Sequence, residues 1–163
     1  MNNDFIKELG YKALDSRLKR ISDRISHDIR KVYKEFEIDV EPNWYLIFML
    51  LQKKENVSMS DIAAKLGYSH PSIVVIVKKM TEKGYLKTEQ DKTDKRKQVI
   101  SLTDKANELI PELKKFWNSC ENAILNMINN DLSILSYLDK IDLELQKTSF
   151  HYRFKQEFLK SNY

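Results

Sequence analysis

Only three Gly and three Pro residues occur in this chain of 163 residues. These two residue types interrupt helices most strongly, so their scarcity predicts long helices joined by short connections. The apolar residues agree, because Leu14, Leu18, Ile21 and Ile25 recur at spacings of three and four, as on one face of a helix. We therefore expect a mainly α protein. Helices are predicted over about 5–37, 43–54, 104–128, 132–145 and 150–163.

Two shorter helices are predicted in the middle of the chain. Residues 58–61 (Ser-Met-Ser-Asp) form a variant capping box, with Asp in place of the usual Glu or Gln. Gly67 can supply the left-handed residue that ends this helix. Ser69 is the next candidate N-cap, with Pro71 in the first turn, and Gly84 ends the second helix.

A charged β-hairpin is predicted after Gly84. Residues 85–89 and 98–102 are strand-like, and 90–97 between them are all polar or charged. Residues 78–97 contain eight Lys or Arg and four Asp or Glu, which accounts for the whole net charge of +4. Such a local excess favours contact with a polyanion, although a solvated lysine-rich surface has the same composition.

This order of elements predicts a winged helix-turn-helix, and a plain helical hairpin with a surface loop is the simpler alternative. The second helix would enter the major groove of double-stranded DNA, and the hairpin would reach the flanking minor groove. We expect base contacts from the first turn of this helix and phosphate contacts from its later lysines. The candidate DNA-contacting residues on it are Ser69, His70, Pro71, Ser72, Val75, Lys78 and Lys79.

Three segments resemble the multiple-antibiotic-resistance regulator (MarR) family: 58–67, 80–86 and 91–103. The resemblance covers roughly residues 10–145. It implies a homodimer whose N- and C-terminal helices interlock, and an operator that is pseudo-palindromic. It also implies a repressor that is relieved by a small ligand or by thiol oxidation. On this basis the chain is one domain, 1–163, with a winged helix-turn-helix at about 43–103 and dimerisation helices at 5–37 and 104–163.

The family resemblance also assigns roles to individual residues. Asp94 and Arg96 would pair to stiffen the hairpin, which is the wing of the motif, and Lys95 or Arg96 would enter the minor groove. An effector crevice would be lined by Trp44, Tyr45 and Phe48, although aromatic residues at helical spacing are more often core. Arg17, Trp44 and residues 69–72 resemble family members that are fused to an acetyltransferase domain, and the absence of a Gly-rich loop here implies a stand-alone form.

The sequence departs from the family at Val74 and Val75, where polar residues are usual. One interpretation is apolar contact with thymine methyl groups. The other, which we favour, is that one valine packs inward and its neighbour lies near the DNA without specifying a base.

Other functions are not indicated. His27, His70 and His151 have no metal-ligand spacing, and no catalytic constellation or cofactor loop is found, so we expect neither an enzyme nor a bound cofactor or metal. The single cysteine, Cys120, lies on an apolar seam, which favours a buried thiol over a redox sensor. No apolar run approaches the ~18 residues of a membrane span, and we expect a cytoplasmic protein. The alternative to DNA binding is a winged helix that binds an acidic protein partner.

Overall fold

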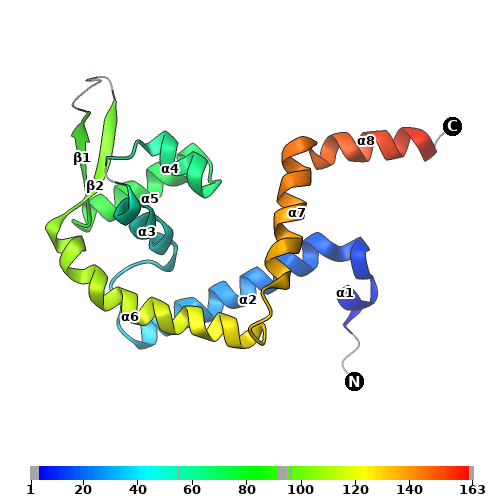
Figure 1. The fold of residues 1–163 in the computed structure, drawn as a ribbon, viewed down its shortest axis with the longest axis horizontal. Coiled ribbons are helices and arrows are strands. Elements are labelled where there is room, and N and C mark those ends of the chain that lie inside the picture. Colours follow the sequence, from blue (N-terminus) through cyan, green and yellow to red (C-terminus); the bar gives the residue numbers. More distant parts are fainter. Residues whose placement is uncertain (1–3, 55, 92–94, 96, 162–163) are drawn as a thin grey trace. The chain divides into compact units, whose positions relative to one another are not determined.

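The computed structural model describes residues 4–54, 56–91, 95 and 97–161. They form two compact units, 1–115 and 116–163, and the long helix α6 (Asp104–Met127) begins in the first and ends in the second. The predicted mainly α fold with a small hairpin is confirmed (Figure 1). None of the described helices has the combination of length and apolarity needed to cross a bilayer.

The first unit starts with a broken helix rather than the single helix predicted over 5–37. The pieces are α1 (Phe5–Glu8), the 3-10 helix η1 (Gly10–Ala13) and α2 (Leu14–Glu35). The break follows from Gly10, whose φ of 59° is left-handed and cannot continue a right-handed helix. Arg20 then donates two hydrogen bonds of 2.9 Å to Asp4, which caps α1. These hydrogen bonds lower the pKa of Asp4 to about 2.

Three helices and a hairpin complete the core of this unit. After η2 (Pro42–Trp44) come α3 (Tyr45–Lys53), α4 (Met59–Leu66) and α5 (His70–Glu82). Strands β1 (Leu86–Gln90) and β2 (Gln98–Leu102) pair antiparallel, with Leu86 opposite Leu102. Apolar side chains from each of these elements are almost completely buried together, and we expect this burial to supply most of the unit's stability. Those with less than 2% of their surface exposed include, with two side chains from α6, Ile47, Phe48, Ile62, Ile73, Met80, Leu86, Ile100, Ile110 and Leu113.

A short bridge ties the helix pair to the hairpin. Val57, in the connection between α3 and α4, exchanges both backbone hydrogen bonds with Ile100 of β2, at 3.3 and 2.9 Å. Both side chains are fully buried. The segment that leads into α4 is therefore held beside the hairpin by an isolated β-bridge.

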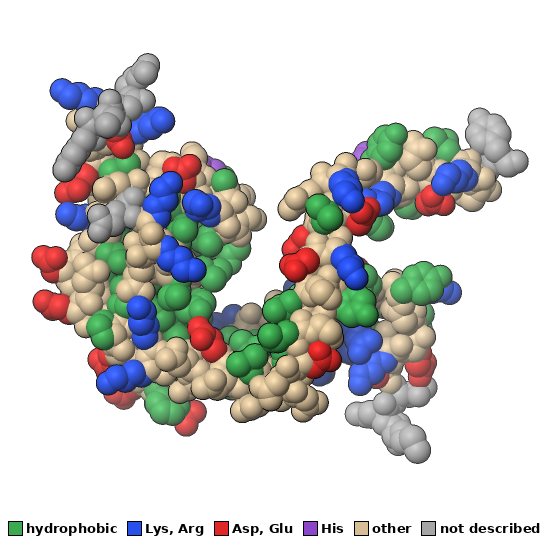
Figure 2. Space-filling view, viewed as in Figure 1, with side chains coloured by type: hydrophobic (Ala, Val, Ile, Leu, Met, Phe, Trp, Pro, Cys, Tyr) green, Lys and Arg blue, Asp and Glu red, His purple; other side chains and the backbone are tan. Residues whose placement is uncertain are grey.

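The second unit continues α6 into α7 (Ser133–Lys147) and α8 (Phe150–Ser161). Asn129 and Asn130 have positive φ angles, which confirms the predicted break between α6 and α7. Apolar side chains line the surfaces of α7 and α8 (Figure 2), and neither helix has a buried residue. The most exposed of them are Ile134, Leu135, Tyr137, Leu143, Leu145, Phe150, Tyr152, Phe154, Phe158 and Leu159.

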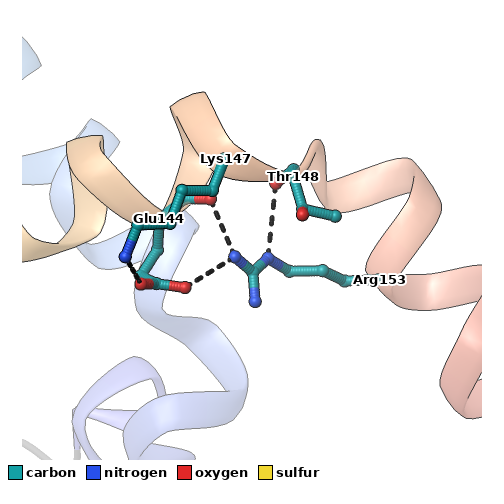
Figure 3. A network of polar contacts seen from close by, with 4 residues as sticks. All are labelled: Glu144, Lys147, Thr148 and Arg153. Atoms are coloured by element: carbon teal, nitrogen blue, oxygen red, sulfur yellow. Dashed lines mark hydrogen bonds and ion pairs between the residues drawn. The ribbon is translucent and has the colours of Figure 1, made fainter.

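Arg153 fixes the corner between α7 and α8 (Figure 3). Its guanidinium donates to the backbone oxygens of Glu144, at 2.7 Å, and Thr148, at 3.3 Å. It also pairs with the Glu144 carboxylate at 2.8 Å, which Lys147 contacts from the other side at 2.9 Å. The last carbonyl groups of a helix lack partners within the helix, so this arginine acts as a C-terminal cap for α7.

Candidate nucleic-acid interface

The predicted punctuation of the helix pair is confirmed. The Ser58 hydroxyl accepts from the Asp61 amide at 3.1 Å and donates to the Asp61 carboxylate at 2.8 Å, which lowers the pKa of Asp61. Gly67 ends α4 in the left-handed conformation, with φ 66°. The Tyr68 amide donates to the Ala63 oxygen at 3.1 Å, and Ser69 then caps α5. These local bonds fix the turn between the two helices.

The first turn of α5 carries four of the predicted base-contacting residues, and all four are exposed. The Ser69 hydroxyl accepts from the Ser72 amide at 3.3 Å and lies 2.8 Å from the Ser72 hydroxyl. The two hydroxyl groups therefore satisfy part of each other's hydrogen-bonding capacity. His70 and Pro71 lie between them on the exposed first turn.

The expectation that one of the two valines packs inward is wrong. Val74 is 36% exposed and Val75 is 56% exposed, whereas Ile76 is only 9% exposed. Each residue advances about 100° around a helix, so Ile73, Ile76 and Met80 fall on one face and Val75 falls opposite Ile73. The structure thus places both valines on the solvent-exposed side of the helix.

The two lysines of α5 lie in different surroundings. Lys78 is exposed and lies 3.8 Å from Glu82, one turn later on the same face. Lys79 lines a hollow of about 620 Å³ together with Arg30, Pro42, Trp44 and other residues. An exposed pair such as Lys78 and Glu82 contributes little to stability, so Lys78 can be drawn to another anion at small cost.

The wing is described up to its tip. The amide of Asp91 donates to the oxygen of Lys97 at 2.9 Å and closes the hairpin, and the Gln90 amide group donates to the Lys95 oxygen. Lys95 is exposed, as a groove contact requires. The predicted stiffening pair, Asp94 and Arg96, lies outside the described residues.

The three aromatic residues predicted for an effector crevice are placed differently from one another. Trp44 lines the hollow described above, although only 2% of its surface is exposed. Phe48 is fully buried and Tyr45 is half-buried. The rings of Trp44 and Phe48 both pack edge-on against Tyr85, with centroids 5.9 Å away in each case.

A polar cluster around Asp39 was not predicted. Lys83, which caps the C-terminal end of α5, pairs with Asp39 at 2.6 Å, and Tyr85 donates to the Asp39 backbone oxygen at 3.3 Å. Lys105 donates to the Lys83 oxygen at 2.7 Å and lies 4.4 Å from the centre of the Tyr85 ring. The hydrogen bond from Lys83 lowers the pKa of Asp39, while burial raises the pKa of Tyr85. The cluster ties the connection between α2 and α3 to the end of α5.

Cys120 is half-buried rather than buried. Burial, and then the nearby Glu121 carboxylate, raise the pKa of its thiol, which disfavours the reactive thiolate. Across the described residues no group of His, Cys, Asp or Glu side chains is arranged to hold a metal ion.

Comparisons with known proteins found relatives in both sequence and fold. Residues 38–97 match the model of the MarR family. The HTH-type transcriptional regulator Hpr of Bacillus cytotoxicus is 29% identical over 113 residues, which are 68% of this chain and 60% of Hpr. The chain thus aligns with about 60% of the length of this curated relative.

Two DNA-bound structures share the fold. The transcriptional repressor CouR, bound to a 23-mer duplex, superposes with a TM-score of 0.71 at 22% identity, over 82% of this chain and 96% of CouR. MepR of S. aureus, in a DNA complex, gives 0.69 at 16% identity over 81% and 97%. Identities this low establish the fold alone. Over residues 38–97 the chain is therefore similar in sequence to the MarR family, and its fold is that of winged helix-turn-helix structures.

Proposed function

We propose that this chain is a transcriptional regulator that binds double-stranded DNA through α5 and the hairpin. The observation that carries the proposal is the exposed face of α5, which combines a serine-capped first turn with Lys78 beside a basic hairpin. CouR and MepR, which share the fold, are both DNA-bound in their structures. Lys78, Lys79 and Lys95 would contact phosphates, and Ser69, His70 and Ser72 would face base edges.

A salt titration tests the electrostatic part of this proposal. Three lysines in each of two subunits give about six phosphate contacts, so the log–log slope of affinity against salt is expected to be roughly −5. Removing one lysine per subunit should make the slope less steep by about two. Fluorescence anisotropy with genomic DNA fragments measures this salt dependence of the DNA affinity for the wild type, for Lys78→Ala and for the control Lys160→Ala on α8. A slope near zero would refute the proposal.

The rival function is a winged helix that binds an acidic protein. It differs from DNA binding in what the wing contacts, so Lys95→Ala combined with Arg96→Ala separates the two. We expect this double variant to lose most of its DNA affinity, while its thermal denaturation midpoint stays within a few degrees of the wild type. An unchanged DNA affinity would favour the rival.

We further propose that the regulator is a homodimer and a repressor of a pseudo-palindromic operator. The support for the dimer is the exposed apolar side chains on α7 and α8, because large apolar surfaces on a single chain mark contact sites, and the support for repression is the fold shared with the transcriptional repressor CouR. In such a dimer the two α5 helices would lie about 34–36 Å apart, one turn of DNA. Light scattering should give twice the chain mass of 19.4 kDa. A monomer at micromolar concentration would contradict the proposal.

An effector would bind in the hollow beside Trp44. Its volume of about 620 Å³ suits a small molecule, and its lining combines the basic Arg30, Lys79 and Lys83 with the acidic Asp39, Glu41 and Glu82. Because Lys79 and Lys83 belong to α5 and its cap, a ligand there would move the DNA-contacting helix directly. Binding of a candidate should change tryptophan fluorescence in the wild type and not in Trp44→Phe. A response that Trp44→Phe retains in full would place the ligand elsewhere.

A further inference from the structure

We propose that Val75 reads a thymine in each half-site through the C5 methyl group of that base. This inference rests on the proposed DNA binding and specifies how one position of the operator is recognised. In this proposal, the residue at the centre of α5 recognises its base through an apolar contact and not through a hydrogen bond.

The first support is the position of Val75 on the helix. It lies opposite the buried Ile73 and is 56% exposed, so it points away from the core. Its neighbours on the same exposed face are Pro71, one turn earlier, and Lys78, nearly one turn later. If Lys78 contacts a phosphate at the edge of the groove, Val75 faces the floor of the groove, where base edges lie.

The second support is the chemistry of the surrounding side chains. Val75 is 56% exposed and Val74 is 36% exposed, so two adjacent apolar side chains face solvent on a helix that buries Ile73, Ile76, Val77 and Met80. The hydroxyls of Ser69 and Ser72 lie 2.8 Å apart and partly satisfy each other. The middle of the helix therefore offers apolar surface where direct readout by hydrogen bonds would need a donor or acceptor.

The third support is the match between valine and its target. Thymine is the only base that presents a methyl group in the major groove, so an apolar side chain there distinguishes it from the other three. Valine is branched at Cβ and strongly prefers one rotamer in a helix, which gives its two methyl groups a fixed direction. Little side-chain freedom is then lost on binding.

Replacing thymine by uracil in the DNA removes the C5 methyl group and nothing else. An operator is first selected by the wild-type protein from random duplexes, and each thymine is then replaced singly by deoxyuridine. Burying one methylene-sized group is worth about 0.8 kcal/mol, so we expect about a fourfold loss of affinity at one thymine per half-site. Replacing that thymine in both half-sites should cost about fifteenfold.

The protein side of the experiment assigns this loss to Val75. Val75→Ala should bind the thymine and uracil operators equally, because the methyl groups that contact the base are gone. Val74→Ala should retain the discrimination, and so should Lys78→Ala, which should weaken binding to both operators alike. Circular dichroism checks that each variant is folded, as expected for exposed positions.

The two levels of the proposal fail in different ways. If the protein selects an operator but no uracil replacement shows a loss that Val75→Ala abolishes, this inference is wrong and the DNA-binding function stands. If no duplex is enriched at all, the proposed function itself fails.

Discussion

Replacing Gly67 by Ala tests whether the left-handed turn between α4 and α5 is set by glycine. The φ and ψ of Gly67 are 66° and 23°, and an added Cβ would meet no other atom within 4 Å. The cost is therefore conformational. Alanine in the left-handed region destabilises the folded state by ~1–2 kcal/mol, and the smaller entropy of the unfolded alanine chain offsets ~0.4–1 kcal/mol of this. We expect the free energy of unfolding to fall by about 1 kcal/mol, and the thermal midpoint to fall by about 2–4 °C.

Urea denaturation followed by circular dichroism measures this change. Asn tolerates the left-handed region better than Ala, so Gly67→Asn should lose clearly less stability than Gly67→Ala. Gly10→Ala is a matched control, because its φ is 59° and its added Cβ would also meet nothing within 4 Å. A loss above about 3 kcal/mol for Gly67→Ala would reveal a clash, and equal losses for Asn and Ala would refute the conformational explanation.

Three further predictions concern the core, the polar cluster and the thiol. Phe48→Ala should lower the free energy of unfolding by ~3–5 kcal/mol in urea denaturation, and Leu46→Ala, 38% exposed on the same helix, by much less. Asp39→Asn should lower the thermal midpoint at pH 7 only slightly, by at most ~2–4 °C, because the ion pair with Lys83 that it removes is exposed. The pKa of Asp39 is lowered in the folded state. Its contribution to the free energy of unfolding is therefore present above the unfolded-state pKa and is lost as the pH falls through the folded-state pKa. Equal thermal midpoints for Asp39→Asn and the wild type at pH 7 would contradict the prediction. Cys120 should react with iodoacetamide at pH 7 more slowly than free cysteine does, since its raised pKa reduces the thiolate, and a faster reaction would contradict that assignment.

Features with local causes could be predicted from the sequence. The Ser58 and Ser69 caps, the Gly67 turn and the break at residues 129–131 each depend on residues within four positions of one another. Side-chain type alone was enough to identify them. The predicted strands were also correct to within one residue, because the change from helical spacing to alternation is sharp there.

The errors came from features that periodicity does not encode. The apolar spacing over 5–37 is continuous, yet a single left-handed glycine at position 10 divides the helix. At Val74 and Val75 the residue types are as apolar as a core, and only the burial of Ile76 shows which face is inside. The ion pair between Asp39 and Lys83 joins residues 44 positions apart, for which no sequence pattern gives a signal.

The backbone bridge between Val57 and Ile100 limits the internal freedom of the first unit. It joins the entry to α4 to the second strand of the hairpin, so these two backbone hydrogen bonds oppose movement of the hairpin relative to the helix pair. A regulator built this way would read each half-site and its flank as one block of fixed length. Inserting a base pair within a block should abolish binding, whereas adaptation to operators of different spacing would have to come from the junction between the two subunits.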